Sequence, residues 1–191
     1  MAARFVTGAT DARALPDLNL PEFAFIGRSN VGKSSLLAMV LGQPKLVRVS
    51  RTPGRTRELN LFTLNGQYAL VDLPGYGYAH ASKADRAALR ELIAQYVFVR
   101  ENVSGIVLVV DARREQGMPA DREMASAVRE TGRPLLVVVT KMDLVPKNRA
   151  LACVRRIEAA LDIPAGVSVA ASAKTGQGRA EILARFAELG A

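Results

Sequence analysis

Strands that alternate with helices along the chain predict an α/β fold, with a mixed but mostly parallel sheet that is covered by helices on both faces. Two continuous apolar runs, 105–110 and 135–139, are typical of parallel strands that are buried on both sides. A third apolar run, 23–26, leads directly into a glycine-rich segment and then a helix. These three observations predict strands with a ligand site where they end.

Six strands are expected, and the elements between them have their own signals. Residues 59–64 and 68–73 alternate enough to be strands, and Asn65-Gly66 between them predicts a tight antiparallel hairpin. A short strand is expected at 167–170, and residues 1–20 are expected to form an arm before the domain at 21–191. No internal repeat or linker divides the chain, so one domain is expected.

The helices follow from apolar spacing and from stop signals. A helix over 35–41 ends at Gly42, and a helix capped by Ser82 carries one apolar face. Further helices are expected at 121–131, from about Pro146, and at 181–189. The face of the second helix consists of Leu89, Leu92, Ile93, Tyr96 and Val97, and the helix from Pro146 is expected to carry Leu151, Val154, Ile157 and Leu161 inward.

Composition narrows the class of protein. The chain has 191 residues, 49% of them hydrophobic and 23% charged, which is ordinary for a globular domain. Its apolar runs are too short to span a bilayer, and its start lacks an export signal, so we expect a cytoplasmic protein with no membrane partner. The single cysteine, Cys153, fits a reducing compartment and is interpreted as a core residue; the single histidine, His80, is interpreted as a surface residue.

The net charge of +8 favours a polyanionic partner, nucleic acid before membrane. Much of the excess lies between Lys45 and Arg57, where the residues include Arg48, Arg51 and Arg55 and no acid. The alternative is a solvated basic loop without a partner.

The segment from Gly27 to Ser34 has the pattern G-x-x-x-x-G-K-S between a strand and a helix, which predicts a phosphate-binding loop. Glycines let the backbone N–H groups wrap a phosphate chain, and the helix N-terminus adds partial positive charge. Lys33 is expected to bind the β- and γ-phosphates, and the Ser34 hydroxyl to coordinate Mg²⁺. The expected nucleotide contacts here are Gly27, Arg28, Ser29, Asn30, Val31, Gly32, Lys33, Ser34 and Ser35.

Two further segments are candidates for the metal and the γ-phosphate. The hairpin ends in Asp72-Leu73-Pro74-Gly75, where the carboxylate can hold Mg²⁺ and the glycine N–H can approach a γ-phosphate. In Gly54-Arg55-Thr56, the threonine can coordinate Mg²⁺ through its hydroxyl, although Thr52 is a rival for this role. The sequence therefore predicts Ser34, Thr56 and Asp72 as metal ligands, and Lys33, Thr56 and Gly75 as the catalytic positions.

Two loops near the C-terminus are candidates for base recognition. Thr140-Lys141-Met142-Asp143 follows a buried strand, and its carboxylate can accept the N1 and N2 protons of guanine, while the lysine stem covers the purine. The alternative for Asp143 is a helix cap. In Ala171-Ser172-Ala173-Lys174, a backbone N–H, best that of Ala173, can donate to guanine O6.

These motifs together resemble the EngB (YihA/YsxC) family of ribosome-biogenesis GTP-binding proteins, which are translation-factor-class P-loop GTPases. The most specific stretches are 21–37, Thr52 to Thr56 and Asp72 to Ala79. The resemblance implies a monomeric Ras-like G domain that binds GTP or GDP with Mg²⁺ and acts in large ribosomal subunit assembly on ribosomal RNA, with a link to cell division and septation. The family often has Phe-Ser-Ser where this chain has Ala171-Ser172-Ala173.

Tyr76 follows Gly75, where many GTPases have the glutamine that orients the attacking water. Slow GTP hydrolysis is therefore expected. Asn30 occupies the position that related GTPases use to hold K⁺, and the alternative is a hydrogen bond that stabilises the loop.

Two other classes of function remain alternatives. An ATP-using P-loop kinase would have no use for Asp143. An RNA-binding module with a largely non-hydrolytic nucleotide site would be expected to lose its metal and phosphate residues, and those are intact here.

Overall fold

A computed structural model describes residues 2–49, 58–76, 83–114 and 118–191. Within them a seven-stranded mixed sheet has the order β1-β3-β4-β2-β5-β6-β7. Its strands are β1 (Ala3–Ala9), β2 (Glu22–Gly27), β3 (Leu59–Leu64), β4 (Tyr68–Asp72), β5 (Val103–Asp111), β6 (Leu135–Thr140) and β7 (Val169–Ala170). The α-helices are α1 (Lys33–Leu41), α2 (Pro44–Val49), α3 (Lys83–Val99), α4 (Pro119–Glu130), α5 (Ala150–Ala160) and α6 (Arg179–Leu189). Short 3-10 helices cover Ala12–Ala14, Met142–Leu144 and Lys147–Arg149.

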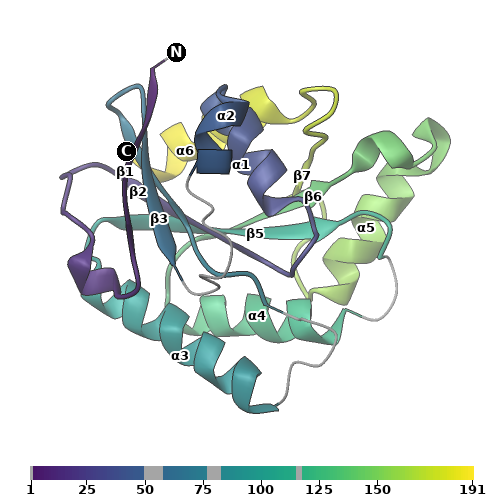
Figure 1. The fold of residues 1–191 in the computed structure, drawn as a ribbon. Coiled ribbons are helices and arrows are strands. Elements are labelled where there is room, and N and C mark those ends of the chain that lie inside the picture. Colours follow the sequence, from purple (N-terminus) through teal and green to yellow (C-terminus); the bar gives the residue numbers. More distant parts are fainter. Residues whose placement is uncertain (1, 50–57, 77–82, 115–117) are drawn as a thin grey trace.

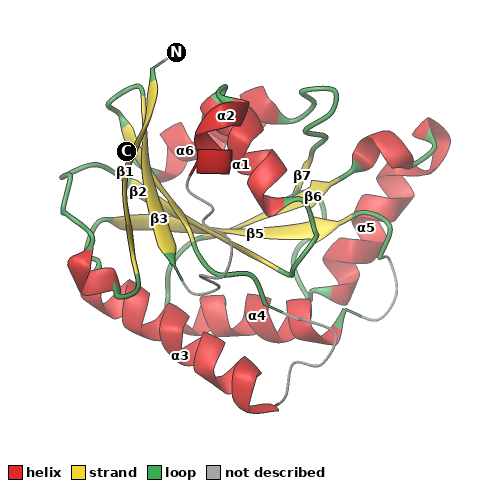
Figure 2. Cartoon of the chain, viewed as in Figure 1, coloured by secondary structure: helices red, strands yellow, loops and turns green. Residues whose placement is uncertain are grey.

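Helices cover both faces of the sheet, as the sequence predicts (Figures 1 and 2). One hydrophobic core packs α3, α4 and α5 against one face, and a second packs α1, α2 and α6 against the other. Strands β2, β4, β5, β6 and β7 pair in parallel, while β1, β3 and β4 pair antiparallel. The α/β fold with a mixed, mostly parallel sheet is thereby confirmed.

The β3–β4 hairpin forms as predicted. Asn65 and Gly66 have φ values of 55° and 66°, the left-handed backbone that the tightest hairpin turns require at both central positions. Asn65 also accepts a hydrogen bond at its side-chain oxygen from the backbone N–H of Ala2, at 3.1 Å. The turn therefore fixes the register of the hairpin and holds the start of β1.

The strand count predicted from the sequence was wrong by one. Part of the expected arm, Ala3–Ala9, is strand β1 and pairs antiparallel with β3 at the edge of the sheet. Part of the expected basic loop also has regular structure, because Pro44–Val49 forms α2. A proline is well tolerated at the first position of a helix, and Val47 is buried in the second core, which explains why this short helix forms.

The helix expected from Pro146 begins later than predicted. Lys147–Arg149 is a 3-10 turn, and α5 proper begins at Ala150. Leu151, which was expected to point inward, is 71% exposed, because Ala150 takes the inward position in that turn. The interpretation of Cys153 as a core residue is confirmed, since its side chain is buried.

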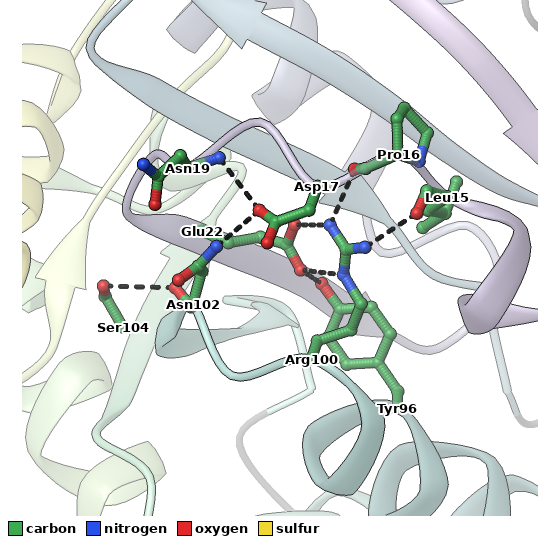
Figure 3. Close-up of polar contacts among 9 residues, drawn as sticks. All are labelled: Leu15, Pro16, Asp17, Asn19, Glu22, Tyr96, Arg100, Asn102 and Ser104. Atoms are coloured by element: carbon green, nitrogen blue, oxygen red, sulfur yellow. Dashed lines mark hydrogen bonds and ion pairs between the residues drawn. The ribbon is translucent and has the colours of Figure 1, made fainter.

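A buried ionic cluster fastens the segment before β2 to the end of α3 (Figure 3). Arg100 donates to both carboxylate oxygens of Glu22, at 2.5 Å and 3.2 Å, and Tyr96 also donates to that carboxylate. The same guanidinium donates to the carbonyls of Leu15 and Pro16, at 2.9 Å and 3.1 Å. Burial, followed by the charge of Glu22, raises the pKa of Tyr96 well above its usual value, so its phenol stays a donor.

Several predicted features lie outside the described residues. They are Thr52, Gly54, Arg55, Thr56, His80 and the helix cap Ser82, together with Arg51 and Arg57 of the basic segment. Of the helices in the described part of the chain, none has both the length and the apolar character to cross a membrane.

Candidate nucleotide-binding site

The predicted phosphate loop joins β2 to α1 at the carboxyl edge of the sheet. Gly32 caps α1 with a left-handed φ of 99°, and no side chain caps this end of the helix. Because glycine has no side chain to cap the helix, the capping residue leaves the N–H groups of the first helical turn available, which suits an anion. Asn30 also has a left-handed backbone, with φ 66°, a conformation that asparagine tolerates better than most residues.

Lys33 reaches from the first turn of α1 to the end of β4. Its ammonium forms an ion pair with the Asp72 carboxylate and donates to the carbonyl oxygen of Leu73 at 2.7 Å. Both side chains are about nine-tenths buried. The residue predicted to bind phosphate and a predicted metal ligand therefore lie in direct contact.

Gly75 lies against the phosphate loop. A Cβ atom at this position would lie 3.4 Å from the carbonyl oxygen of Gly27 and 3.5 Å from Oγ of Ser29, so a larger residue would press on the loop. The backbones of Tyr76 and the phosphate loop also exchange hydrogen bonds: Tyr76 N–H donates to Gly27 at 3.2 Å, and Ser29 N–H donates to Tyr76 at 2.8 Å. The structure therefore brings the Asp72–Gly75 segment and the phosphate loop together.

The Tyr76 side chain is buried and reaches helix α4. Its hydroxyl donates to the carboxylate of Asp121 on α4 at 2.7 Å, and both residues are buried. Burial, and then the nearby Asp121 carboxylate, raises the pKa of Tyr76 well above its usual value. Burial also raises the pKa of Asp121. The Tyr76 hydroxyl therefore stays protonated and donates its hydrogen bond to α4.

The Thr140–Asp143 segment is fastened to the phosphate loop at two points. The Thr140 hydroxyl lies 2.6 Å from the carbonyl oxygen of Val31, and the Lys141 ammonium donates to the carbonyl of Asn30 at 2.7 Å. Lys141 has a left-handed backbone, with φ 61°, which turns its side chain back over the loop. The stem passes Gly32, where an added Cβ would lie 3.6 Å from Cε of Lys141.

The last two predicted motifs also meet. Asp143 accepts a hydrogen bond from the Ser172 hydroxyl at 2.6 Å, and Met142 N–H donates to Ala171 at 3.2 Å. Ser172 N–H is used within its own loop, where it donates to Gln177 at 3.1 Å. Ala173 and Lys174 are exposed beside this pair.

Two buried carboxylates at this edge were not identified from the sequence. Asp111 ends β5 and accepts from Lys141, and Asp121 accepts from Tyr76. Asp111 had a usable signal, because it ends a buried strand as Asp72 does. Asp121 had none, since an acid in the first turn of a helix is common.

The described residues fit a nucleotide with Mg²⁺. The start of α1, where Gly32 provides no side-chain cap, and the Lys33 ammonium suit phosphates, and Ser34 and Asp72 carry oxygen atoms of the kind that Mg²⁺ prefers as ligands. Asp143 and Ser172, from the two loops that the sequence predicts to recognise a base, lie in direct contact.

Known proteins are similar to this chain in both sequence and fold. Residues 22–141 match a family model described as a 50S ribosome-binding GTPase. The probable GTP-binding protein EngB of Desulfatibacillum aliphaticivorans is 44% identical over 181 residues, which cover 95% of this chain and 88% of that protein. The protein of the same name from Pelotomaculum thermopropionicum is 41% identical over 182 residues, covering 95% of this chain and 91% of that one.

Solved structures of GTP-binding proteins have a similar fold. The crystal structure of a probable GTP-binding protein EngB has a TM-score of 0.73 and 26% identity, covering 88% of this chain and 97% of that chain. Era, in a crystal structure with MgGDPNP and a segment of 16S ribosomal RNA, has a TM-score of 0.62 and 24% identity, covering 89% of this chain and 56% of that one, a likeness of fold alone. With the site's geometry, these relatives show that the chain belongs to the EngB family of P-loop GTP-binding proteins.

Proposed function

We propose that this protein binds GTP and GDP with Mg²⁺, hydrolyses GTP slowly, and acts as a switch in assembly of the large ribosomal subunit. The observation that carries the nucleotide proposal is the contact between Lys141 and the Asn30 carbonyl. It joins the loop predicted to recognise the base to the loop predicted to bind the phosphates. Membership of a GTPase family supports hydrolysis in general.

Each residue has a role in this proposal. Lys33 neutralises charge on the β- and γ-phosphates, and Ser34, Asp72 and Thr56 hold Mg²⁺, which neutralises the developing phosphate charge when bound. The Gly75 N–H contacts the γ-phosphate. Hydrolysis is slow because Tyr76 is hydrogen-bonded to α4 and cannot orient water. We further propose that Asn30 supports a K⁺ ion beside the phosphates.

Base recognition is tested by changing Asp143. We expect tight binding of GDP and GTP and weak binding of ATP, because the carboxylate accepts two protons that only the guanine edge offers. Asp143→Asn should weaken GDP binding and favour xanthosine diphosphate, which carries an oxygen at C2. Asp162→Asn is the matched control, since Asp162 is an exposed aspartate outside the site and its change should leave both affinities as they were. Equal affinity of the unaltered protein for ATP and GTP would reject the assignment.

The ribosomal proposal rests on the family description and on the net charge of +8. We expect the protein to sediment with large-subunit particles when GTP is present and less when GDP is present. Because phosphate contacts release counterions, binding should weaken steeply as salt rises. Arg51→Glu should reduce sedimentation and leave GTP affinity unchanged, while Arg4→Glu, the same change in charge on exposed β1, should leave sedimentation intact.

Binding to particles that is equal with GDP and GTP would contradict the switch. If particle binding persisted without any GTP hydrolysis, the protein would instead be an RNA-binding module with a non-hydrolytic nucleotide site. We propose that it acts as a monomer in the cytoplasm, where ribosomes are assembled. Any effect on division and septation would follow from a shortage of large subunits.

A further inference from the structure

The side-chain carboxylate of Asp111 is buried at the end of β5, next to the proposed nucleotide site. Its side chain is 1% exposed. One oxygen accepts from the backbone N–H and Nε of Arg113, at 3.0 Å and 3.1 Å. The other accepts from Nη2 of Arg113 and from the Lys141 ammonium, both at 2.8 Å. Four donors from two residues therefore converge on one carboxylate.

This carboxylate is ionised at neutral pH. Burial alone would raise the pKa of Asp111, but the hydrogen bonds from Arg113 and Lys141 outweigh it and lower the pKa to about 2. A buried charge with partners on both oxygens has a fixed orientation. Lys141 therefore faces a fixed negative charge on one side and the Asn30 carbonyl on the other.

Lys141 needs such support. Its side chain is 26% exposed, its backbone is left-handed, and a free lysine has many rotamers that point into water. Without Asp111, the partner that remains for the ammonium among the described residues is the neutral carbonyl of Asn30. Its stem would then no longer be held across Gly32.

We propose that Asp111 is a positioning residue that fixes Lys141 across the phosphate loop and thereby slows the release of guanine nucleotide. This role rests on the proposed function, because it requires the nucleotide to bind between the phosphate loop and the Thr140–Asp143 segment. Asp111 acts through Lys141, which covers the purine face and does not contact the donors that distinguish guanine. It therefore affects the lifetime of the complex and leaves base preference to Asp143.

The test is the dissociation rate of fluorescent mant-GDP from the full chain, chased with excess GDP. A charge-assisted hydrogen bond lost from a buried site is expected to speed release by about tenfold in Asp111→Asn. The preference for guanine over xanthine nucleotide should not change. Asp162→Asn is the control: it is the same change of side chain, but the Asp162 side chain is 73% exposed and lies outside this cluster, so release should change by less than about twofold.

A double-mutant cycle separates positioning from general loosening. In a Lys141→Met background, Asp111→Asn should no longer speed release, because the group that it positions is gone. An equal acceleration in both backgrounds, or release from Asp111→Asn at the unaltered rate, would overturn the inference. Should Asp111→Asn not fold, Asp111→Glu keeps the charge but moves it by one methylene, and unchanged release from that variant would overturn the inference as well.

Failure of the proposed function looks different. If the unaltered protein does not bind mant-GDP in a direct titration, the proposed function and this inference fall together. If it binds and the variants behave alike, only the role of Asp111 is rejected.

Discussion

Replacing Arg100 by alanine should cost the fold several kcal/mol while leaving nucleotide binding intact. The arginine side chain is 7% exposed and that of Glu22 is 1% exposed, so the pair is buried. Within the described residues, Arg100→Ala leaves the Glu22 carboxylate with Tyr96 as its remaining side-chain donor, and it removes the donor to the Leu15 carbonyl. Breaking a buried ion pair by removing one partner costs about 3–5 kcal/mol. The segment before β2 also loses its attachment to α3.

The assay is urea denaturation followed by circular dichroism, with mant-GDP affinity measured below the transition. A loss of about 4 kcal/mol is a large share of the roughly 5–15 kcal/mol that stabilises a domain, and it should lower the Tm by roughly 10 °C. Affinity should hold, because Glu22 begins β2 and the phosphate loop follows the other end of that strand.

Arg185→Ala is the matched control. Arg185 forms an ion pair with Glu188 at 3.0 Å, but the two side chains are 38% and 61% exposed. Removing such a surface pair should change stability by less than about 1 kcal/mol. A destabilisation by Arg100→Ala no larger than that by Arg185→Ala would refute the assigned role of the buried pair.

Three further outcomes are expected from the site. Tyr76→Phe should destabilise the protein by about 1–3 kcal/mol in urea denaturation, because buried Asp121 loses its donor, and it should leave the GTPase rate within about twofold of the original, since the phenol points to α4. Replacing Na⁺ by K⁺ at fixed ionic strength should raise the GTPase rate, and Asn30→Ala should abolish that difference. If the rate does not change on replacing Na⁺ by K⁺, Asn30 does not support a K⁺ ion, and its left-handed backbone conformation in the loop is the role that remains. Because the pKa of Asp111 is lower in the folded chain than the ordinary 3.8, its contribution to stability is complete above about pH 4 and disappears as the pH falls towards 2. The difference in urea stability between the unaltered protein and Asp111→Asn should therefore shrink over that range, and a difference that grew on acidification would contradict the assigned contacts.

The sequence predicted those features that depend on local pattern. Asn65-Gly66 specified its turn because few other residues tolerate two successive left-handed positions. The interior strands were recognisable because burial on both faces demands unbroken apolar runs, such as those in β5 and β6.

The features that the sequence missed depend on distant partners. Strand β1 has no regular alternation of apolar and polar residues, and it becomes a strand because β3 offers it an edge to pair with. Leu151 fitted a helical spacing, but where the helix begins decides which residue faces inward, and a local pattern sets that boundary poorly. Asp111 contacts Lys141 from 30 residues away, and Tyr76 contacts Asp121 from 45 residues away, so only the folded chain reveals these two contacts.

Strand β1 also bears on how the protein stays dispersed in a crowded cell. The register between β1 and β3 shifts between Phe5 and Thr7, and Val6 is 37% exposed there. An irregular outer strand is a poor template for another chain, whereas a regular edge invites strand-to-strand aggregation. A chain shortened by its first nine residues would expose the edge of β3, a strand rich in buried apolar residues. We therefore expect a shortened chain to self-associate and precipitate even where its nucleotide site is intact.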